Sequence, residues 1–373
     1  MSINKDLPIS VVLLDNVKLP VFCDTETGTD IILPEAFGSA GEIFYEKLSD
    51  GKALFSCDLS ATGVWLYESQ TKSWTQLLET GSWNSLQKLP NGDCLIGSEY
   101  FAGLHVFENS TNTVINIPGT DTYLTAFQVL DNGNCLIGGL QIGAVLLYHA
   151  TTKTITRFGV NSTGFIYYHL LSNGDCLIGG ISNGVLLYNN NTETVSKIYS
   201  EGSSWLCFAE LANGECLIFS DDSGVEYGLL FDPVTSALTN IPTQGRVFDI
   251  AYATRDGGCL LSSSLRSTTG VYYYDPLTKQ IVQKYTSSIS WLYFKTLEND
   301  NCLISSSATN TGILLFDNVA KTVSRKHAKS NKWNIFEEQS NGDCVIKNNQ
   351  ADVKYTLIYE QSTNNVRVYS YLA

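Results

Sequence analysis

The sequence has no apolar run long enough to cross a bilayer, and it has few basic residues. A membrane-spanning helix needs about 18 consecutive apolar residues, and no segment comes near that length. The opening stretch MSINKDLPISVVLLDN lacks the basic and then apolar regions of a secretory signal. Lysine and arginine number 23 against 37 acidic residues, a formal net charge of −14, which repels nucleic-acid phosphates. We therefore expect a cytoplasmic protein with no nucleic-acid or membrane partner; export without a cleaved signal is the alternative.

The chain has few histidines and no closely spaced cysteine pairs, although both are common in catalytic and metal centres. Four histidines occur, at positions with no common spacing: His105, His149, His169 and His327. Nucleophilic catalysis needs a base beside its nucleophile, and zinc sites usually draw on closely spaced cysteine pairs, which this chain does not have. The acidic pair Asp221-Asp222 lacks the spacing of a calcium loop. The sequence predicts no catalytic centre, no metal site and no cofactor.

What the chain does contain is a repeat. The stretch NGDCLIGG, residues 173–180, recurs with small changes along the sequence. Seven of the ten cysteines fall at its fourth position, at intervals of 40 to 43 residues, and we call them the phase cysteines: Cys94, Cys135, Cys176, Cys216, Cys259, Cys302 and Cys344. Ala53 and Val11 stand at the same position one and two intervals upstream. A fixed interval of this length is typical of a repeat architecture, in which each unit packs on its neighbours.

Each repeat has the pattern of four short strands. In residues 164–199 the runs FIYYHLL, CLIGG, VLLYN and TVSKIY are rich in β-branched and aromatic residues and are separated by Gly, Asn, Asp, Ser and Thr. The Asn-Gly pair between the first two runs suits the positive φ angles of a tight hairpin. No helical period longer than a turn is present. Four-stranded units repeated in this way predict an all-β fold, a β-propeller of four-stranded antiparallel blades.

The repeat count predicts one propeller domain over residues 1–373. Residues from about 37 to 373 make eight full repeats of about 42 residues. Residues 1 to about 36 make a truncated first unit, in which only Met1 to Asp6 remain for a first strand. We favour nine blades; eight blades with an N-terminal extension is the alternative.

Several repeats also resemble those of kelch-type propellers. The run CLIGG, followed later by GVLLYNNNTETVSKI, has a glycine pair after a strand and a tyrosine before a turn, as kelch-type blades do. In VWLYESQTKSWTQLL, Trp74 stands where kelch repeats place a tryptophan. Only two repeats keep the glycine pair, and Val114, Ile155 and Val195 replace the tryptophan in others. The resemblance implies a binding platform in most cases and an enzyme in a few, so it does not assign a function.

The phase cysteines are not expected to form disulfides. A disulfide needs Cα atoms within about 7 Å of each other, whereas equivalent strands of neighbouring sheets lie about 10 Å apart. Ala53 and Val11 at the same position indicate that a small apolar residue serves there. We predict that the phase cysteines are reduced and fill the interior of each repeat.

The strongest candidate for a binding surface is an aromatic position eleven residues before the phase cysteine. Apart from Leu124, its occupants over the last seven repeats are Trp83, Phe165, Trp205, Phe248, Trp291 and Trp333. This position starts the first strand of a repeat, at the same end as loops of variable sequence, and variable loops on a constant scaffold commonly carry recognition. Arg246 and Asp249 are polar residues beside it, together with Asn84, Arg266 and Asn334.

Two interpretations of the aromatic position remain open. The rings line the mouth of a central channel and bind a peptide, a protein or a sugar ring, or they are wedges that pack one blade against the next. The candidate binding residues are Trp83, Phe165, Trp205, Phe248, Trp291, Trp333, Arg246 and Asp249.

Three functions are compatible with this sequence. The first is a non-catalytic propeller that binds a protein or peptide on its loop-bearing face and channel mouth. The second is a carbohydrate-binding, lectin-like propeller with a tryptophan in each site. The third is a metal-assisted lyase or hydrolase at the channel mouth, with His169, Arg246 and Asp249 as its polar groups. The scarcity of catalytic side chains favours the first, and we predict that the protein is not an enzyme.

Overall fold

The chain forms two compact units, residues 1–202 and residues 203–373. The computed structural model describes residues 9–14, 17–24, 29–37, 42–49, 51–58, 62–79, 81–98, 103–120, 123–139, 143–159, 164–181, 184–200, 203–222, 224–264, 269–306, 312–328, 333–348 and 355–370. Within this part of the chain, no helix has both the length and the apolar character needed to span a membrane.

The first unit consists of antiparallel sheets whose strands follow one another in the chain. Among its described residues, one sheet has three strands (β1 to β3) and four sheets have four. The strands are β1 Ile9–Leu14, β2 Val17–Asp24, β3 Thr29–Ile32, β4 Ile43–Lys47, β5 Lys52–Cys57, β6 Val64–Glu68, β7 Ser73–Leu78, β8 Ser85–Lys88, β9 Cys94–Gly97, β10 Leu104–Glu108, β11 Thr113–Ile117, β12 Ala126–Val129, β13 Cys135–Gly138, β14 Ala144–His149, β15 Thr154–Gly159, β16 Phe165–Leu170, β17 Cys176–Gly180, β18 Val185–Asn189 and β19 Thr194–Tyr199. A single 3-10 turn, η1 Glu35–Phe37, follows β3.

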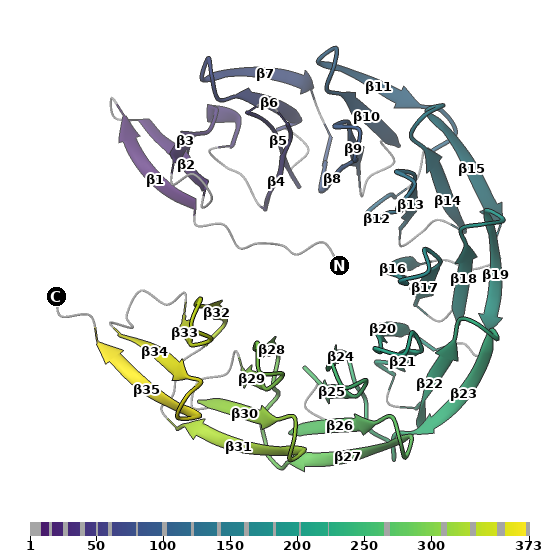
Figure 1. Cartoon of the computed structure of the whole chain (residues 1–373). Helices are drawn as coiled ribbons and strands as arrows, with labels where there is room; N and C mark the ends of the chain where they lie inside the picture. The colour runs from purple at the N-terminus through teal and green to yellow at the C-terminus, as the bar shows by residue number, and fades with distance from the viewer. Residues whose placement is uncertain are drawn as a thin grey trace. The chain divides into compact units, whose positions relative to one another are not determined.

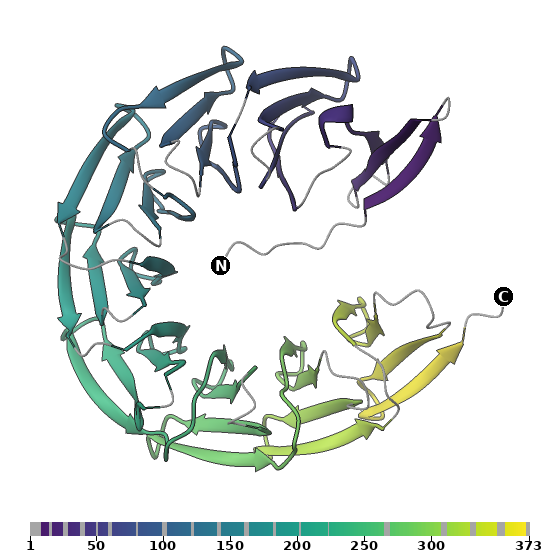
Figure 2. The same ribbon diagram turned by 180° about the vertical axis from the view of Figure 1, so that it is seen from behind.

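The second unit has four such four-stranded sheets among its described residues. Their strands are β20 Trp205–Glu210, β21 Cys216–Ser220, β22 Tyr227–Asp232, β23 Ala237–Pro242, β24 Ile250–Ala253, β25 Cys259–Ser262, β26 Val271–Asp275, β27 Gln280–Tyr285, β28 Tyr293–Thr296, β29 Cys302–Ser305, β30 Ile313–Asp317, β31 Thr322–His327, β32 Ile335–Glu338, β33 Cys344–Lys347, β34 Tyr355–Glu360 and β35 Asn365–Ser370. Within this unit the sheets stand side by side in chain order, with β20, β24, β28 and β32 along one side and β23, β27, β31 and β35 along the other (Figure 1). The view from behind agrees (Figure 2).

These sheets confirm the predicted all-β class and the four-stranded blades. The second strand of seven sheets begins at a phase cysteine, and within residues 164–199 the strands match the four predicted runs to within one residue. Eight or nine blades are both consistent with the structure. Met1 to Asp6, predicted to form a short first strand, lie outside the described residues.

The NGDC stretch forms the turn between the first and second strands of a sheet. In the sheet β16 to β19, Gly174 has a φ of 85°, a conformation that a side chain would strain. Asn173 Oδ1 accepts a hydrogen bond from the amide of Asp175 over 2.9 Å. Asp175 Oδ1 in turn accepts a bond from the amide of Asn190, in the turn between the third and fourth strands, over 2.9 Å. The residue before the phase cysteine therefore ties the two hairpins of one sheet together.

The same bond recurs in four other sheets, with either an aspartate or an asparagine as the acceptor. The pairs, acceptor first, are Asp93 and Asn109, Asn134 and Ala150, Asn301 and Asn318, and Asp343 and Gln361.

The hydrophobic core lies between consecutive sheets. One core cluster joins Leu136 and Val145, from the sheet β12 to β15, with Ile178 and Cys176 from the sheet β16 to β19. All seven phase cysteines are buried free thiols, as predicted. Cys57 and Cys207, which stand outside the repeat position, are also buried and belong to no disulfide.

Candidate functional site

The aromatic position before each first strand is buried, so these rings do not line a binding surface in this structure. Trp83 is 2% exposed, and Phe165, Trp205, Phe248, Trp291 and Trp333 are 0% exposed. The structure agrees with the interpretation that these residues are wedges between sheets. It corrects the interpretation that they line an exposed channel mouth.

The packing of these rings explains their burial. Trp291 lies in a cluster with Leu260 and Val271 of the preceding sheet and with Ile304 of its own sheet. Phe248 stands edge to face with the ring of Phe219 from the sheet before it, with ring centroids 5.4 Å apart. A large ring at this position fills the space between two sheets, where burial of its apolar area stabilises their contact.

Arg246 and Asp249, two of the polar residues predicted beside this position, are partly exposed, and each contacts its own repeat. The guanidinium of Arg246 lies 5.1 Å from the centre of the Tyr272 ring, a cation–π contact. Asp249 accepts hydrogen bonds from both the amide and the hydroxyl of Ser264, the amide bond measuring 2.7 Å. Arg266 lies outside the described residues. Arg246 and Asp249 thus hold local structure near the start of β24.

Among the described residues, no group of three or more histidine, cysteine, aspartate or glutamate side chains could hold a metal ion. The thiols are also poorly suited to nucleophilic chemistry. Burial raises the pKa of Cys176 to about 12 and that of Cys302 to about 12, so little thiolate forms near neutral pH.

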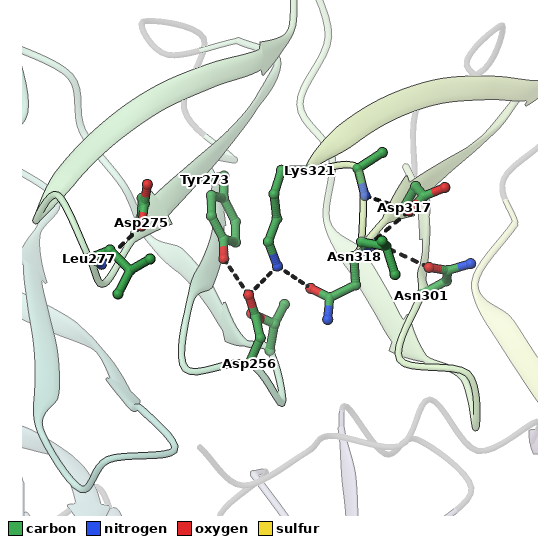
Figure 3. A network of polar contacts seen from close by, with 11 residues as sticks. Asp256, Tyr273, Asp275, Leu277, Asn301, Asp317, Asn318 and Lys321 are labelled. Atoms are coloured by element: carbon green, nitrogen blue, oxygen red, sulfur yellow. Dashed lines mark hydrogen bonds and ion pairs between the residues drawn. The ribbon is translucent and has the colours of Figure 1, made fainter.

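A polar network in the second unit departs from the repeat. In the sheet β24 to β27, Gly258 stands where other sheets have the acceptor aspartate or asparagine. Tyr273 donates a hydrogen bond to Asp256 over 2.7 Å, and Lys321 from the next sheet contacts the same carboxylate (Figure 3). Lys321 also donates to Asn318 over 3.0 Å.

This network links two neighbouring sheets. Burial raises the pKa of Asp256, but the hydrogen bonds from Lys321, Thr254 and Tyr273 and the charge of Lys321 outweigh it and hold this pKa below its ordinary value. Burial and then the neighbouring Asp256 raise the pKa of Tyr273. The aspartate is therefore ionised and the tyrosine protonated at neutral pH. Their polar atoms already form hydrogen bonds with neighbouring residues.

A pocket of about 260 Å³ lies on the first strands of three successive sheets of the first unit. We call it the first-strand pocket; its lining residues are Ser85, Leu86, Gln87, Thr125, Ala126, Phe127, Gln128, Val129, Ile166 and Tyr168. The hydroxyl of Ser85 donates to the carbonyl of Thr125 over 3.0 Å, which links β8 to β12. The pocket therefore depends on the packing of neighbouring repeats.

The lining combines amides, hydroxyls and rings. Gln87 and Gln128 occupy equivalent positions, and each donates through its amide to the carbonyl of the next residue, over 3.0 and 2.8 Å. Tyr168 lines the pocket, its hydroxyl is buried beside Gly138, and burial raises its pKa well above the ordinary value. The lining residues described include no carboxylate, imidazole, amine or thiol. Such a surface can hydrogen-bond and pack but offers no general acid or base at neutral pH.

The sequence carried a signal for the first-strand pocket that we did not use. Gln87 and Gln128 both stand seven residues before a phase cysteine. A polar amide repeated on one position of a first strand marks a surface that is not packed into the core. The volume of the pocket, in contrast, depends on how three strands approach one another.

Comparison with known proteins shows the fold alone. No family model matches the chain, and no curated protein matches it. Among solved structures, the Dos1 propeller is 10% identical, with a TM-score of 0.51 over 90% of this chain and 97% of that one. The computationally designed Ika8 protein is 13% identical, with a TM-score of 0.51 over 87% and 95%. Virginiamycin B lyase from Staphylococcus aureus is 8% identical, with a TM-score of 0.46 over 89% and 99%.

The chain is a β-propeller by its sheets and by these likenesses. No match supports the kelch-type family specifically.

Proposed function

We propose that this protein is a non-catalytic binding scaffold that holds an extended segment of a partner protein in the first-strand pocket. The observation that carries the proposal is the pocket itself, in which amide and aromatic side chains from β8, β12 and β16 converge. The side-chain amides of Gln87 and Gln128 can form further hydrogen bonds with a peptide backbone. Phe127 and Tyr168 offer rings to an apolar side chain.

The size of the pocket supports a peptide over a free small molecule. Sites for small ligands usually measure about 300 to 1,000 Å³ and enclose most of the ligand. At about 260 Å³, the first-strand pocket suits one or two amino-acid side chains of a longer segment. First strands are also sheet edges, whose backbone groups can pair with an added strand.

The other functions considered from the sequence have less support. The lectin-like function relied on exposed tryptophans, and the tryptophans at the repeated position are buried. A carbohydrate remains a second candidate only for the first-strand pocket, because glutamine amides beside aromatic rings can bind sugar hydroxyls. For a lyase or hydrolase, the pocket lining supplies no acid or base. The variable loops between second and third strands stay a predicted partner surface, since most of them lie outside the described residues.

The proposal also includes a cellular compartment and a family relationship. Nine buried free thiols among the described residues support a reducing, cytoplasmic compartment. The packing of Trp74 against Phe55, with ring centroids 5.1 Å apart, supports a kelch-type relationship.

The test is peptide selection against the full chain. A phage library of random peptides is panned on the wild-type protein, and enriched peptides are measured by fluorescence polarisation. The variant A126W fills the pocket, and Q128A removes one amide; we expect each to weaken binding at least about 10-fold, the loss of one or two buried contacts.

The matched control is A251W, a change on the first strand β24 outside the pocket, which should bind like wild type. Circular dichroism establishes that each variant is folded. Failure to enrich any peptide, or enriched peptides that bind A126W and Q128A as tightly as wild type, would overturn the proposal.

A further inference from the structure

Three successive sheets of the second unit each expose one apolar side chain at the same place. Val234, Leu277 and Val319 are 92%, 93% and 92% exposed. Each lies in the turn between the third and fourth strands, two residues before a position with positive φ. The equivalent residues in the other four-stranded sheets are polar: Gln70, Ser110, Thr151, Asn191 and Ser362. We call the three apolar residues the turn tips.

The turn tips are held rigidly. The amide of Val234 donates to Asp232 over 2.9 Å, and the amide of Leu277 donates to Asp275 over 2.9 Å (Figure 3 for Leu277). The amide of Val319 donates to Asp317 over 3.0 Å. Such aspartate turns fix the backbone, so each apolar side chain is presented without further ordering of the loop.

Polar turns separate the tips from one another. Lys279, beside the Leu277 tip, lies 3.6 Å from Glu215 of the preceding sheet. Between Leu277 and Asn318, the residue before Val319 in the chain, stand Asp256 and Lys321 (Figure 3). The tips therefore form no contiguous apolar patch, whereas a stable protein interface has a contiguous apolar core.

The charge of the second unit indicates which kind of partner the turn tips could contact. Residues 203–373 contain 14 basic and 17 acidic residues, while residues 1–202 contain 9 and 20. Lys279, Lys321 and the 63% exposed side chain of Arg255 lie at the same end of the sheets as the tips, and they pair with Glu215, Asp256 and Asp300. These ion pairs leave the surface around the tips nearly neutral. Isolated apolar side chains on such a surface fit the headgroup layer of a lipid bilayer, which accepts each tip separately.

We propose that Val234, Leu277 and Val319 are a peripheral lipid anchor that inserts into the interfacial layer of a zwitterionic membrane. Equivalent residues of successive propeller blades stand at one height along the propeller axis, so a planar surface meets all three together. The proposal revises the expectation of no membrane partner, and it needs no membrane-spanning segment. It is independent of the first-strand pocket.

The experiment is sedimentation of the full chain with phosphatidylcholine vesicles. We expect wild type to bind, and the variant V234S/L277S/V319S to bind at least about 10-fold more weakly, because three buried apolar side chains are lost. The variant V234W/L277W/V319W should bind more tightly, with a blue shift of its tryptophan fluorescence on vesicle addition. Binding should persist at high salt, since it is mainly apolar.

The matched control is Q70S/T151S/N191S, which changes three equivalent turns of the first unit and should bind like wild type. Circular dichroism and thermal unfolding show whether the variants fold. The proposal is wrong if wild type does not sediment with vesicles, or if the tip variant and the control bind alike. A tip variant that loses self-association in sedimentation velocity, with no vesicle binding by wild type, would assign the tips to contact between copies and also refute it.

Discussion

The hydroxyl of Tyr273 occupies the space that a side chain on residue 258 would fill. A Cβ on Gly258 would lie 2.1 Å from that oxygen. In five other sheets the residue before the phase cysteine is an acceptor that ties two hairpins together, as Asp175 does with Asn190. Here the glycine admits the tyrosine, and its hydroxyl reaches Asp256. In this turn, a network that includes Lys321 of the next sheet stands in place of the hydrogen bond within the sheet.

The glycine and the tyrosine should therefore depend on each other. We expect Y273F to lower the free energy of unfolding by about 1 kcal/mol, because Asp256 loses one hydrogen-bond donor. G258D alone should cost more, since its side chain collides with the tyrosine ring. The double variant G258D/Y273L removes that collision and should therefore be less destabilised than the sum of its two single changes; urea unfolding measures all three. Additive losses in the double variant would contradict the coupling.

The stability from Asp256 should depend on pH with a defined sign. Its pKa in the folded protein lies below the unfolded value of about 3.9. A depressed pKa means that the ionised form favours folding, so this contribution is complete above about pH 5 and disappears as pH falls through the folded pKa. The difference in unfolding free energy between wild type and D256N should shrink from pH 6 to pH 3. A difference that stays constant over this range would show that the carboxylate charge contributes nothing.

Much of the fold could be predicted because one pattern repeats. The phase cysteines set the interval, and the Asn-Gly pair located the first hairpin in five repeats, where for example Gly174 and Gly214 have φ angles of 85° and 84°. Local rules of alternation and turn chemistry then gave the strands, since these depend on neighbours in the sequence.

The candidate site could not be predicted equally well. An aromatic residue such as Trp205 at the start of a strand is favoured both in a binding site and between two sheets, and only the packing distinguishes the two. The turn tips had a sequence signal, because Val234 and Leu277 follow Asp-Pro in turns where the other repeats are polar. Recognising it required comparing the same turn across repeats, together with an exposed fraction that the sequence does not supply.

The acceptor before the phase cysteine offers a test of the repeat itself. We expect D175A to lower the unfolding free energy by about 1 kcal/mol, because the partly buried amide of Asn190 loses its partner. D175N should be nearly neutral, since Asn134 and Asn301 accept the same bond in their sheets. Urea unfolding of the two variants measures the difference. Equal losses in both would show that charge, and not the acceptor oxygen, matters at this place.

The phase cysteines should be inert in the folded protein. Because burial raises the pKa of Cys176 to about 12, its thiolate is rare at pH 8, and the surrounding sheets block a reagent. Ellman's reagent should therefore titrate few thiols in native protein and all ten in guanidinium chloride. The variant C176A should unfold only about 1 kcal/mol more easily. Rapid labelling of native protein at most of the thiols would contradict this burial.

The last prediction separates packing from binding at the aromatic position. Trp291 is fully buried, and its indole N–H has no hydrogen-bond partner among the described atoms. We expect W291A to lower the free energy of unfolding by about 3 to 5 kcal/mol through a cavity between two sheets. W291F should cost much less, because Phe165 and Phe248 fill the same position in their repeats and because the substitution removes an unpaired buried donor.

Urea unfolding and peptide binding, measured on the same W291F preparation, decide between the two roles. A wedge predicts a small loss of stability and unchanged affinity in the first-strand pocket, which belongs to the other unit. A binding residue predicts the opposite, a stable protein with weakened affinity. The second outcome would require the indole to leave its place between the sheets, and it would return the aromatic position to the binding surface.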